Sequence, residues 1–148
     1  LILMGRQFTD EGVEHLRECK GLHSLSLRLP QMTDKSLQQL QSLLPQLAML
    51  GITDSQVTDA GLAHLAGLRH LEQLGLDAIP ISDDGLKHLQ QLKNLCVLNL
   101  SRTAITDAGL VHLRGLANLR DLVLSESQVT DAGVADLQTA LPKCVIRF

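Results

Sequence analysis

Four histidines recur at one position of a repeating pattern and could form a ladder of metal ligands, because imidazole is a common ligand for metal ions. They are His15, His64, His88 and His112. The two remaining copies of this position hold Gln39 and Asp136. Stacked helices lie about 8–10 Å apart, whereas zinc requires its nitrogen ligands at about 2.0–2.1 Å. We therefore expect half-exposed imidazoles that hydrogen-bond between neighbouring units, and no bound metal.

Aspartates recur at a second position, where an array of carboxylates could be mistaken for a calcium site or an acid–base pair. Each follows a Thr or a Ser, and the six are Asp10, Asp34, Asp59, Asp83, Asp107 and Asp131. A hydroxyl just before a helix can cap it, and an acidic residue in the first turn suits the helix dipole. The pattern therefore indicates a structural role at the start of each helix.

The three cysteines give no sign of redox or nucleophilic chemistry, since an odd number this small does not make a disulfide framework. Cys19 and Cys144 fall at positions otherwise held by core leucines, whereas Cys96 lies at a variable position and is expected to be partly exposed. The sequence contains no nucleotide-binding glycine loop, no Gly-x-Ser-x-Gly, no His-Glu-x-x-His and no Cys-x-x-Cys. We therefore expect no catalytic residues, no enzymatic activity and no cofactor.

Composition restricts the class of protein further. Of the 148 residues, 45% are hydrophobic, 1% are aromatic and 20% are charged, and the net charge is −3. The chain is too apolar to be disordered, and too acidic and too poor in aromatics for a typical nucleic-acid-binding surface. No apolar run is long enough for a membrane span, so we expect neither nucleic acid nor a membrane as partner. Unpaired thiols without a visible signal peptide predict the cytoplasm, and the start at Leu1 without Met predicts a fragment of a longer chain.

Internal repetition accounts for the recurring positions. Thr-Asp or Ser-Asp occurs six times, at steps of 24, 25, 24, 24 and 24 residues, and leucine fills 33 of the 148 positions. We divide the single predicted domain, 1–148, into about six 24-residue repeats and a C-terminal cap: 1–22, 23–47, 48–71, 72–95, 96–119, 120–144 and the cap 145–148.

Each repeat predicts a short strand and a short helix. The motif Leu-x-x-Leu-x-Leu, as in 95–100, ends in apolar residues that alternate at period two, which is typical of a strand with one buried face. Leucines three residues apart, as in 110–116, form one apolar stripe on a helix. A glycine that recurs in the first helical turn, as at Gly109, is expected to permit close packing.

A single strand–helix unit does not bury its own apolar face, whereas stacked copies do. Strands about 4.8 Å apart form a parallel sheet, and the wider helices on its other side force the stack to curve. The predicted fold is therefore an α/β solenoid, a right-handed arc with a concave parallel sheet and short α-helices on the convex face. The last strand is short and has Arg147 where we expect a core leucine, whereas the first strand has no cap. We expect earlier repeats or a cap at that edge, or self-association through it.

The units QVTDAGLAHLAGLRHLEQLGL, PISDDGLKHLQQLKNLCVLNL and AITDAGLVHLRGLANLRDLVL align without gaps. Their pattern resembles the leucine-rich repeat family over almost all of the chain, and within it the ribonuclease-inhibitor-like, cysteine-containing subfamily. The resemblance implies a protein–protein interaction module with a protein partner. Because that subfamily includes F-box substrate receptors, it also implies, as an alternative, the substrate-receptor part of a ubiquitin-ligase-like assembly. A third alternative is a scaffold segment that self-associates or supports another domain.

Strand side chains that point away from the core form the predicted partner-binding surface on the concave face. They are Ser26, Arg28, Met49, Thr53, Gln73, Asp77, Val97, Asn99, Ser101, Asp121 and Ser125. Binding hot spots favour Trp, Tyr and Arg, and here only Arg28, Met49 and Arg102 would qualify, so the sequence predicts no evident high-affinity site within this surface. The alternative is a solvated sheet face, with binding elsewhere on the molecule.

Overall fold

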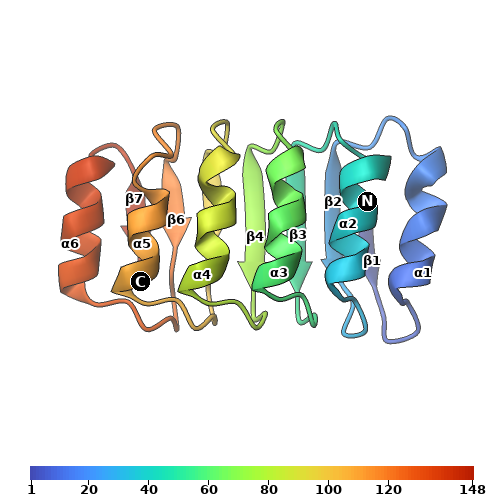
Figure 1. Ribbon diagram of the computed structural model, residues 1–148, viewed down its shortest axis with the longest axis horizontal. Helices are drawn as coiled ribbons and strands as arrows, with labels where there is room; N and C mark the ends of the chain where they lie inside the picture. The colour runs from blue at the N-terminus through green and yellow to red at the C-terminus, as the bar shows by residue number, and fades with distance from the viewer.

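The computed structural model describes residues 1–148, which is the whole sequence, and strands alternate with helices throughout (Figure 1). The strands are β1 (Ile2–Met4), β2 (Ser24–Arg28), β3 (Met49–Thr53), β4 (Gln73–Asp77), β5 (Val97–Asn99), β6 (Asp121–Val123) and β7 (Val145–Arg147). The α-helices are α1 (Asp10–Val13), α2 (Asp34–Leu43), α3 (Asp59–Leu62), α4 (Asp83–Leu86), α5 (Asp107–Leu110) and α6 (Asp131–Ala140). Four continue as 3₁₀-helices: η1 (Glu14–Glu18), η2 (Ala63–Gly67), η3 (Lys87–Gln91) and η4 (Val111–Leu113).

The strands form one parallel sheet in which each strand pairs with the next along the chain, in the order β1-β2-β3-β4-β5-β6-β7. The register sets equivalent residues side by side, so that Leu50 pairs with Leu74 and Leu98 with Leu122. The helices cover one face of the sheet, and their row is longer than the row of strands, which puts the strands on the inner side of a curved stack (Figure 1). The α/β repeat solenoid predicted from the sequence is therefore confirmed.

The core is one continuous cluster of 37 buried residues that runs through all the turns. In β3, Leu50 and Ile52 are buried, whereas the residues that alternate with them are only partly covered. Leucines from the helical side, such as Leu62 and Leu65, close the core from the other direction. Since these side chains are covered by neighbouring turns, the stack as a whole and not a single turn excludes water. None of the helices has the length and apolar character needed to cross a bilayer.

Two lengths of turn produce two kinds of helix. The ten-residue helices α2 and α6 lie in the turns that carry one extra residue and a proline, and there the N–H of Leu44 donates to the carbonyl of Leu40, four residues earlier, at 2.9 Å. In the shorter turns the equivalent N–H of Leu68 donates to Leu65, three residues earlier, at 2.9 Å. A 3₁₀-helix rises further per residue than an α-helix, so the tighter winding spans the same distance with one residue fewer.

Consecutive turns are joined by a ladder of bonds from the recurring aspartates. The carboxylate of Asp83 accepts hydrogen bonds from the backbone N–H and the hydroxyl of Thr106, at 2.8 and 2.6 Å. The same two bonds join Asp10 to Thr33, Asp34 to Thr58, Asp59 to Ser82 and Asp107 to Thr130. The sequence predicted that each hydroxyl caps its own helix. Three of the hydroxyls, those of Thr33, Thr106 and Thr130, do accept a hydrogen bond from the first turn of their own helix. At all five joints, however, the hydroxyl donates its hydrogen bond to the aspartate of the preceding turn.

The recurring glycine makes room for this carboxylate. A Cβ at Gly109 would lie 2.3 Å from Oδ1 of Asp83, and the same conflict with the preceding aspartate would occur at Gly61, Gly85 and Gly133. The close packing predicted for this glycine is therefore confirmed. In the second turn Ser36 occupies the position, and its buried hydroxyl donates to Oδ1 of Asp10 at 2.5 Å.

These bonds favour the charged form of two of the ladder carboxylates, Asp10 and Asp107. For Asp10, burial by itself would raise the pKa, but hydrogen bonds from Ser36 and Thr33 outweigh it and hold the pKa below its usual value. For Asp107, the backbone and hydroxyl bonds from Thr130 lower the pKa. Asp10 and Asp107 therefore contribute to stability when they are ionised.

Two expectations about single residues are wrong. Arg147 does not occupy a core position: it pairs with Val123 in the sheet register and its side chain is exposed on the inner face. The neighbouring Ile146 is the one that packs against the core, so alternation along the strand turns Arg147 to the opposite side. Cys19 is half-buried instead of fully covered, because the first turn has a neighbour on one side only, whereas Cys144 is buried and its burial raises the pKa of its thiol.

Candidate partner-binding face

The residues predicted for the partner-binding face all belong to the sheet surface opposite the helices, where they alternate with buried leucines. The register aligns them in three columns across the strands. The first column runs through Met49, Gln73, Val97 and Asp121, the second from Ser26 across two glycines to Asn99, and the third through Arg28, Thr53 and Asp77. Ser101 and Ser125 continue the third column just beyond β5 and β6.

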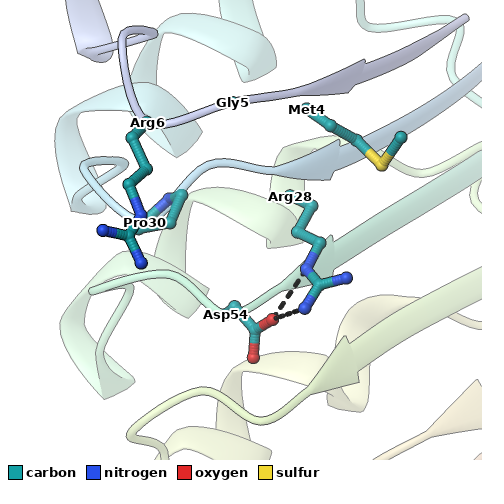
Figure 2. Close-up of a pocket in the computed structure, with 6 residues that line it drawn as sticks. All are labelled: Met4, Gly5, Arg6, Arg28, Pro30 and Asp54. Atoms are coloured by element: carbon teal, nitrogen blue, oxygen red, sulfur yellow. Dashed lines mark hydrogen bonds and ion pairs between the residues drawn. The ribbon is translucent and has the colours of Figure 1, made fainter.

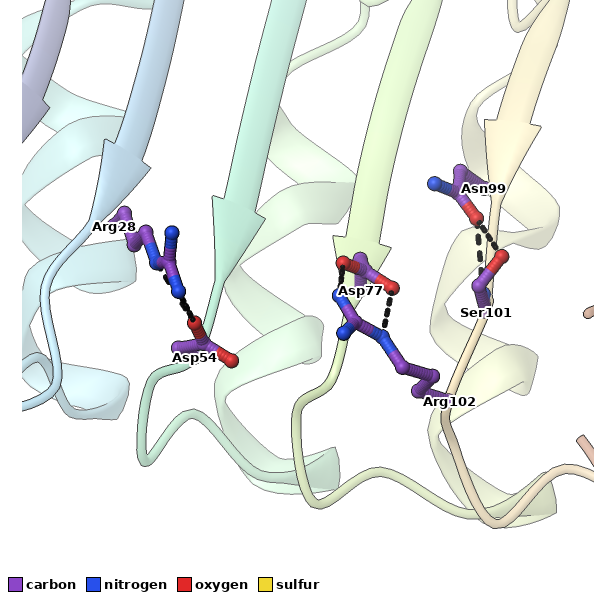
Figure 3. A network of polar contacts seen from close by, with 6 residues as sticks. All are labelled: Arg28, Asp54, Asp77, Asn99, Ser101 and Arg102. Atoms are coloured by element: carbon purple, nitrogen blue, oxygen red, sulfur yellow. Dashed lines mark hydrogen bonds and ion pairs between the residues drawn. The ribbon is translucent and has the colours of Figure 1, made fainter. Parts of the chain in front are cut away.

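Two ion pairs lie at the carboxyl ends of the strands (Figure 3). Nε and a terminal nitrogen of Arg28 both approach Oδ2 of Asp54 at 2.8 Å. Arg102 donates to both carboxylate oxygens of Asp77, with the Nε–Oδ1 distance at 3.1 Å. The hydrogen bond and the charge of Asp77 raise the pKa of the Arg102 guanidinium above its usual value. Each pair joins a residue at the end of one strand to a residue one or three positions beyond the end of the next strand.

Four residues that lie one to three positions beyond β3, β4, β5 and β6 share a left-handed backbone. Asp54, Ala78, Arg102 and Glu126 have φ angles of 51°, 53°, 56° and 59°. This conformation is uncommon for a residue with a Cβ, and its recurrence shows that the turn geometry repeats even where the residue type does not. At Asp54 and Arg102 the side chain contacts a residue at the end of the neighbouring strand (Figure 3).

Two further polar contacts fix side chains on the same surface. Arg147 makes a bidentate ion pair with Asp121, both distances being 2.8 Å. Oδ1 of Asn99 accepts hydrogen bonds from the backbone N–H of Ser101 at 2.9 Å and from its hydroxyl at 2.6 Å (Figure 3). The charged residues predicted for the face are therefore each paired within it: Arg28, Asp77 and Asp121.

An uncharged hollow of about 240 Å³ occupies the centre of the face. Its floor is formed by Gly51 and Gly75, which pair in the sheet register, so that a Cβ added at Gly75 would lie 3.7 Å from Cα of Gly51. Its walls are side chains from four strands: Ser26, Met49, Gln73, Val97 and Asn99. The hollow therefore gives a partner direct access to the sheet backbone between apolar and amide-bearing side chains.

A second hollow, of about 450 Å³, lies nearer the first turn, where β1 and β2 end (Figure 2). It is lined by Met4, Gly5, Arg6, Arg28, Pro30 and Asp54. Arg6 makes no ion pair within the chain, so two guanidinium groups face a single carboxylate here. Sequence reasoning did not select Arg6, Asp54 or Arg147 for this face. Their positions could have identified them. Arg6 and Asp54 come shortly after a strand, and Arg147 lies at an outward-facing position of the last strand.

The histidine column lies on the helical side of the molecule. His112 Nδ1 contacts Nε2 of Gln90 in the preceding turn at 2.9 Å, which is the bond between turns that the sequence predicts. His64 and His88 are half-buried and His15 is exposed, and none of these three makes such a bond, so the predicted bond between turns is found at His112 alone. The structure contains no group of three or more His, Cys, Asp or Glu side chains arranged to hold a metal ion.

Comparison with known proteins relates this architecture to a named repeat. A family model described as leucine-rich repeat matches residues 91–113, and no curated protein matches the sequence. Among solved structures, an internalin of Listeria monocytogenes has a TM-score of 0.79 and 26% identity, over 99% of this chain and 39% of that chain. A leucine-rich repeat protein of Leptospira interrogans has a TM-score of 0.67 and 25% identity, over 100% of this chain and 37% of that chain. A second Listeria monocytogenes protein, internalin C2, has a TM-score of 0.64 and 22% identity, over 98% and 69%.

The chain spans about two fifths of the length of the first two of these structures. Proteins with this fold generally mediate protein–protein interactions. The ribonuclease-inhibitor-like subfamily stays a prediction. The parallel sheet with one short helix per turn, the match to the repeat family and the three similar structures agree that this chain has the leucine-rich repeat fold.

Proposed function

We propose that the chain binds a partner protein through its concave face, with the hollow over Gly51 and Gly75 receiving a side chain of the partner. The observation that carries the proposal is the contrast between an uncharged centre and the three ion pairs that lie around it, while the unpaired Arg6 lies nearer the first turn, outside this hollow. Burying an unpaired charge at an interface costs free energy, whereas a neutral hollow can be desolvated at little cost. A partner can therefore approach this surface without supplying a counter-charge for each residue.

The residue types around the hollow suit such a contact. Met49 and Val97 offer apolar surface on two sides, and a methionine adapts its shape to what it meets. Arg28 and Arg102 keep 63% and 49% of their side chains exposed although they are ion-paired, so guanidinium N–H groups remain available at the rim. Hot spots at interfaces are typically desolvated pockets with arginine or aromatic anchors around or within them. Here the aromatic anchor would come from the partner, since the face has none.

A matched pair of variants tests the site. Gly75→Lys fills the hollow with a long charged side chain that points away from the core, and Ala108→Lys makes the same addition to the exposed helical side. Proteins captured from a lysate of the source cells by the unchanged chain are identified, and their recovery with the two variants is compared. We expect loss with Gly75→Lys and retention with Ala108→Lys, both variants keeping the far-UV circular dichroism of the parent. Equal recovery with both would exclude the concave centre as the contact surface.

A second candidate function is a scaffold that self-associates through β1. The observation in its favour is the exposure of Ile2 and Met4, 68% and 63%, on an edge strand that has only one neighbour. A dimer in light scattering that grows with concentration and is lost on Ile2→Ser with Met4→Ser would favour it. The substrate-receptor role in a ubiquitin-ligase-like assembly stays a prediction from the sequence resemblance, and the same concave face would serve it.

A further inference from the structure

We propose that the hollow where β1 and β2 end binds an acidic side chain of the partner protein, an aspartate or a glutamate, through Arg6 and Arg28. The partner is the one that the proposed function invokes, and the inference rests on that function. The acidic contact lies in the hollow of about 450 Å³ that is lined by Met4, Gly5, Arg6, Arg28, Pro30 and Asp54 (Figure 2).

The charges that line this hollow do not balance. Arg6 and Arg28 bring two positive charges, and Asp54 brings the single negative charge. Asp54 is paired with Arg28, whereas the side chain of Arg6 lies beside Pro30 and makes no ion pair and no hydrogen bond within the chain (Figure 2). In the two ion pairs farther along the face, each guanidinium has a carboxylate of its own. One guanidinium is therefore left for a carboxylate from another molecule.

Arg28 also keeps donors free although it is paired. Its Nε and one terminal nitrogen both approach Oδ2 of Asp54 at 2.8 Å, and its other terminal nitrogen makes no hydrogen bond within the chain. That nitrogen points away from Asp54 (Figure 2). Guanidinium groups match the geometry of a carboxylate, and hydrogen bonds between two charged groups are stronger than neutral ones. Arg6 and Arg28 can therefore both donate to an acidic side chain that enters the hollow.

The size and lining of the hollow favour a protein side chain over a free inorganic anion. A volume of about 450 Å³ falls in the range of about 300–1,000 Å³ that is typical of ligand pockets. Met4, which is exposed, and Pro30 add apolar surface beside the two arginines. The methylene groups of an aspartate or a glutamate can cover that surface, whereas an inorganic anion makes no use of it.

The spacing of the two hollows predicts where the acidic residue lies in the partner. Ser26 belongs to the wall of the central hollow, and Arg28 lies two residues farther along the same face of β2. Residues two positions apart in a strand are separated by about 6.6 Å. If the partner contributes an extended segment, the acidic residue is therefore expected two positions from the residue that enters the central hollow.

The test uses small probes and follows the Nε–H signals of the arginines in proton–nitrogen NMR spectra of the labelled chain. The probes are N-acetylglutamate amide, its neutral counterpart N-acetylglutamine amide, and inorganic phosphate. We expect the glutamate derivative to shift the signals of Arg6 and Arg28, and the glutamine derivative to leave them in place. Arg6→Gln should raise the half-saturating concentration seen at Arg28 roughly fivefold, which corresponds to one exposed ion pair. Arg69→Gln removes an exposed arginine elsewhere and should change nothing.

Three results would overturn the proposal. The first is the absence of any shift at the two arginines. The second is a response of Arg28 that Arg6→Gln leaves unchanged. The third is half-saturation at a lower concentration of phosphate than of the glutamate derivative, because the site would then select a phosphate group.

The capture experiment with Gly75→Lys separates a failure of this proposal from a failure of the proposed function. Loss of the same captured proteins with Gly75→Lys and with Arg6→Gln, but not with Arg69→Gln, supports the acidic contact. Loss with Gly75→Lys and full recovery with Arg6→Gln excludes the acidic contact and leaves the concave site standing. Equal recovery with Gly75→Lys excludes the concave site, whereas the response of the two arginines to the probes does not depend on it.

Discussion

The same substitution at two equivalent glycines should have opposite effects on stability. Replacing a helical glycine by alanine ordinarily stabilises a protein by about 0.5–1 kcal/mol, because the unfolded chain loses freedom. At Gly12 the new Cβ would have only an ordinary contact, 3.7 Å from the Phe8 ring. We therefore expect Gly12→Ala to raise the free energy of unfolding by about 0.5–1 kcal/mol.

At Gly109 the same methyl group would collide with the carboxylate of Asp83, which belongs to the aspartate ladder. It would lie 2.3 Å from Oδ1 of Asp83 and 3.1 Å from the backbone Cα of that residue, so the carboxylate must leave its place beside Thr106. Overpacking of this kind costs about 1–3 kcal/mol. The gain of about 0.5–1 kcal/mol from replacing a helical glycine offsets part of this cost. We therefore expect Gly109→Ala to lower the free energy of unfolding by about 1–2 kcal/mol. For a chain of this size that corresponds to a fall in Tm of roughly 2–8 °C.

Urea titration by far-UV circular dichroism measures both effects, because the chain has no Trp or Tyr to report by fluorescence. A third variant assigns the cause: in an Asp83→Ala background the closest atoms are gone, and the cost of Gly109→Ala should shrink to the residual contact with the backbone of residue 83. If both glycines tolerate alanine equally, or if the cost at Gly109 survives unchanged without the carboxylate, the packing argument for this column is refuted.

Three further predictions follow from the ladder and the thiols. The pKa values of Asp10 and Asp107 are lowered in the folded state, so their contribution to stability is present above the unfolded value near 3.8 and is lost as the pH falls through the folded values; replacing both by Asn should flatten urea midpoints measured from neutral pH to below 3.8. Ser36→Ala removes a buried hydroxyl that binds Asp10 and should lower the free energy of unfolding by about 1–2 kcal/mol, with the pKa of Asp10 moving up in a carboxyl NMR titration. A thiol reagent should modify the half-exposed Cys96 well before Cys144, whose burial raises its pKa; equal rates would contradict that placement.

The alternation of leucines predicted much of the fold. The same local pattern occurs six times in the chain, so an assignment made in one repeat can be compared with the other five. Period-two alternation located β2, β3 and β4, and it also assigned their outward residues to one face. The three-residue spacing predicted the helices but not their type. Whether a turn winds as α-helix or 3₁₀-helix depends on one extra residue before the next strand, and that distinction appears only once the stack fixes the distance to be spanned.

The contacts between neighbouring turns could not be predicted from the sequence of a single turn. The sequence indicates that Asp83 begins a helix, but which hydroxyl it meets depends on how the next turn lies beside it. The ion pairs of the concave face could not be predicted for a related reason, since Arg28 and Asp54 lie 26 residues apart in the sequence and meet only because neighbouring turns lie side by side. Arg147 was misassigned because the last strand lacks the full leucine motif that fixes the alternation elsewhere.

Because the chain contains several copies of one repeat, its turns can be compared with one another. This comparison distinguishes structural positions from candidate functional positions within a single sequence. Positions that hold the stack together keep one residue type: leucine in the core, aspartate in the ladder, and Thr or Ser to meet it. The first column of the concave face instead changes chemistry at every step, through Met49, Gln73, Val97 and Asp121. The side chains of that column take no part in the core or in the aspartate ladder. We therefore expect substitutions there to change the free energy of unfolding little. The column is therefore where selection for a particular partner could act, and the hollow beside it is the place to look for that partner's contact.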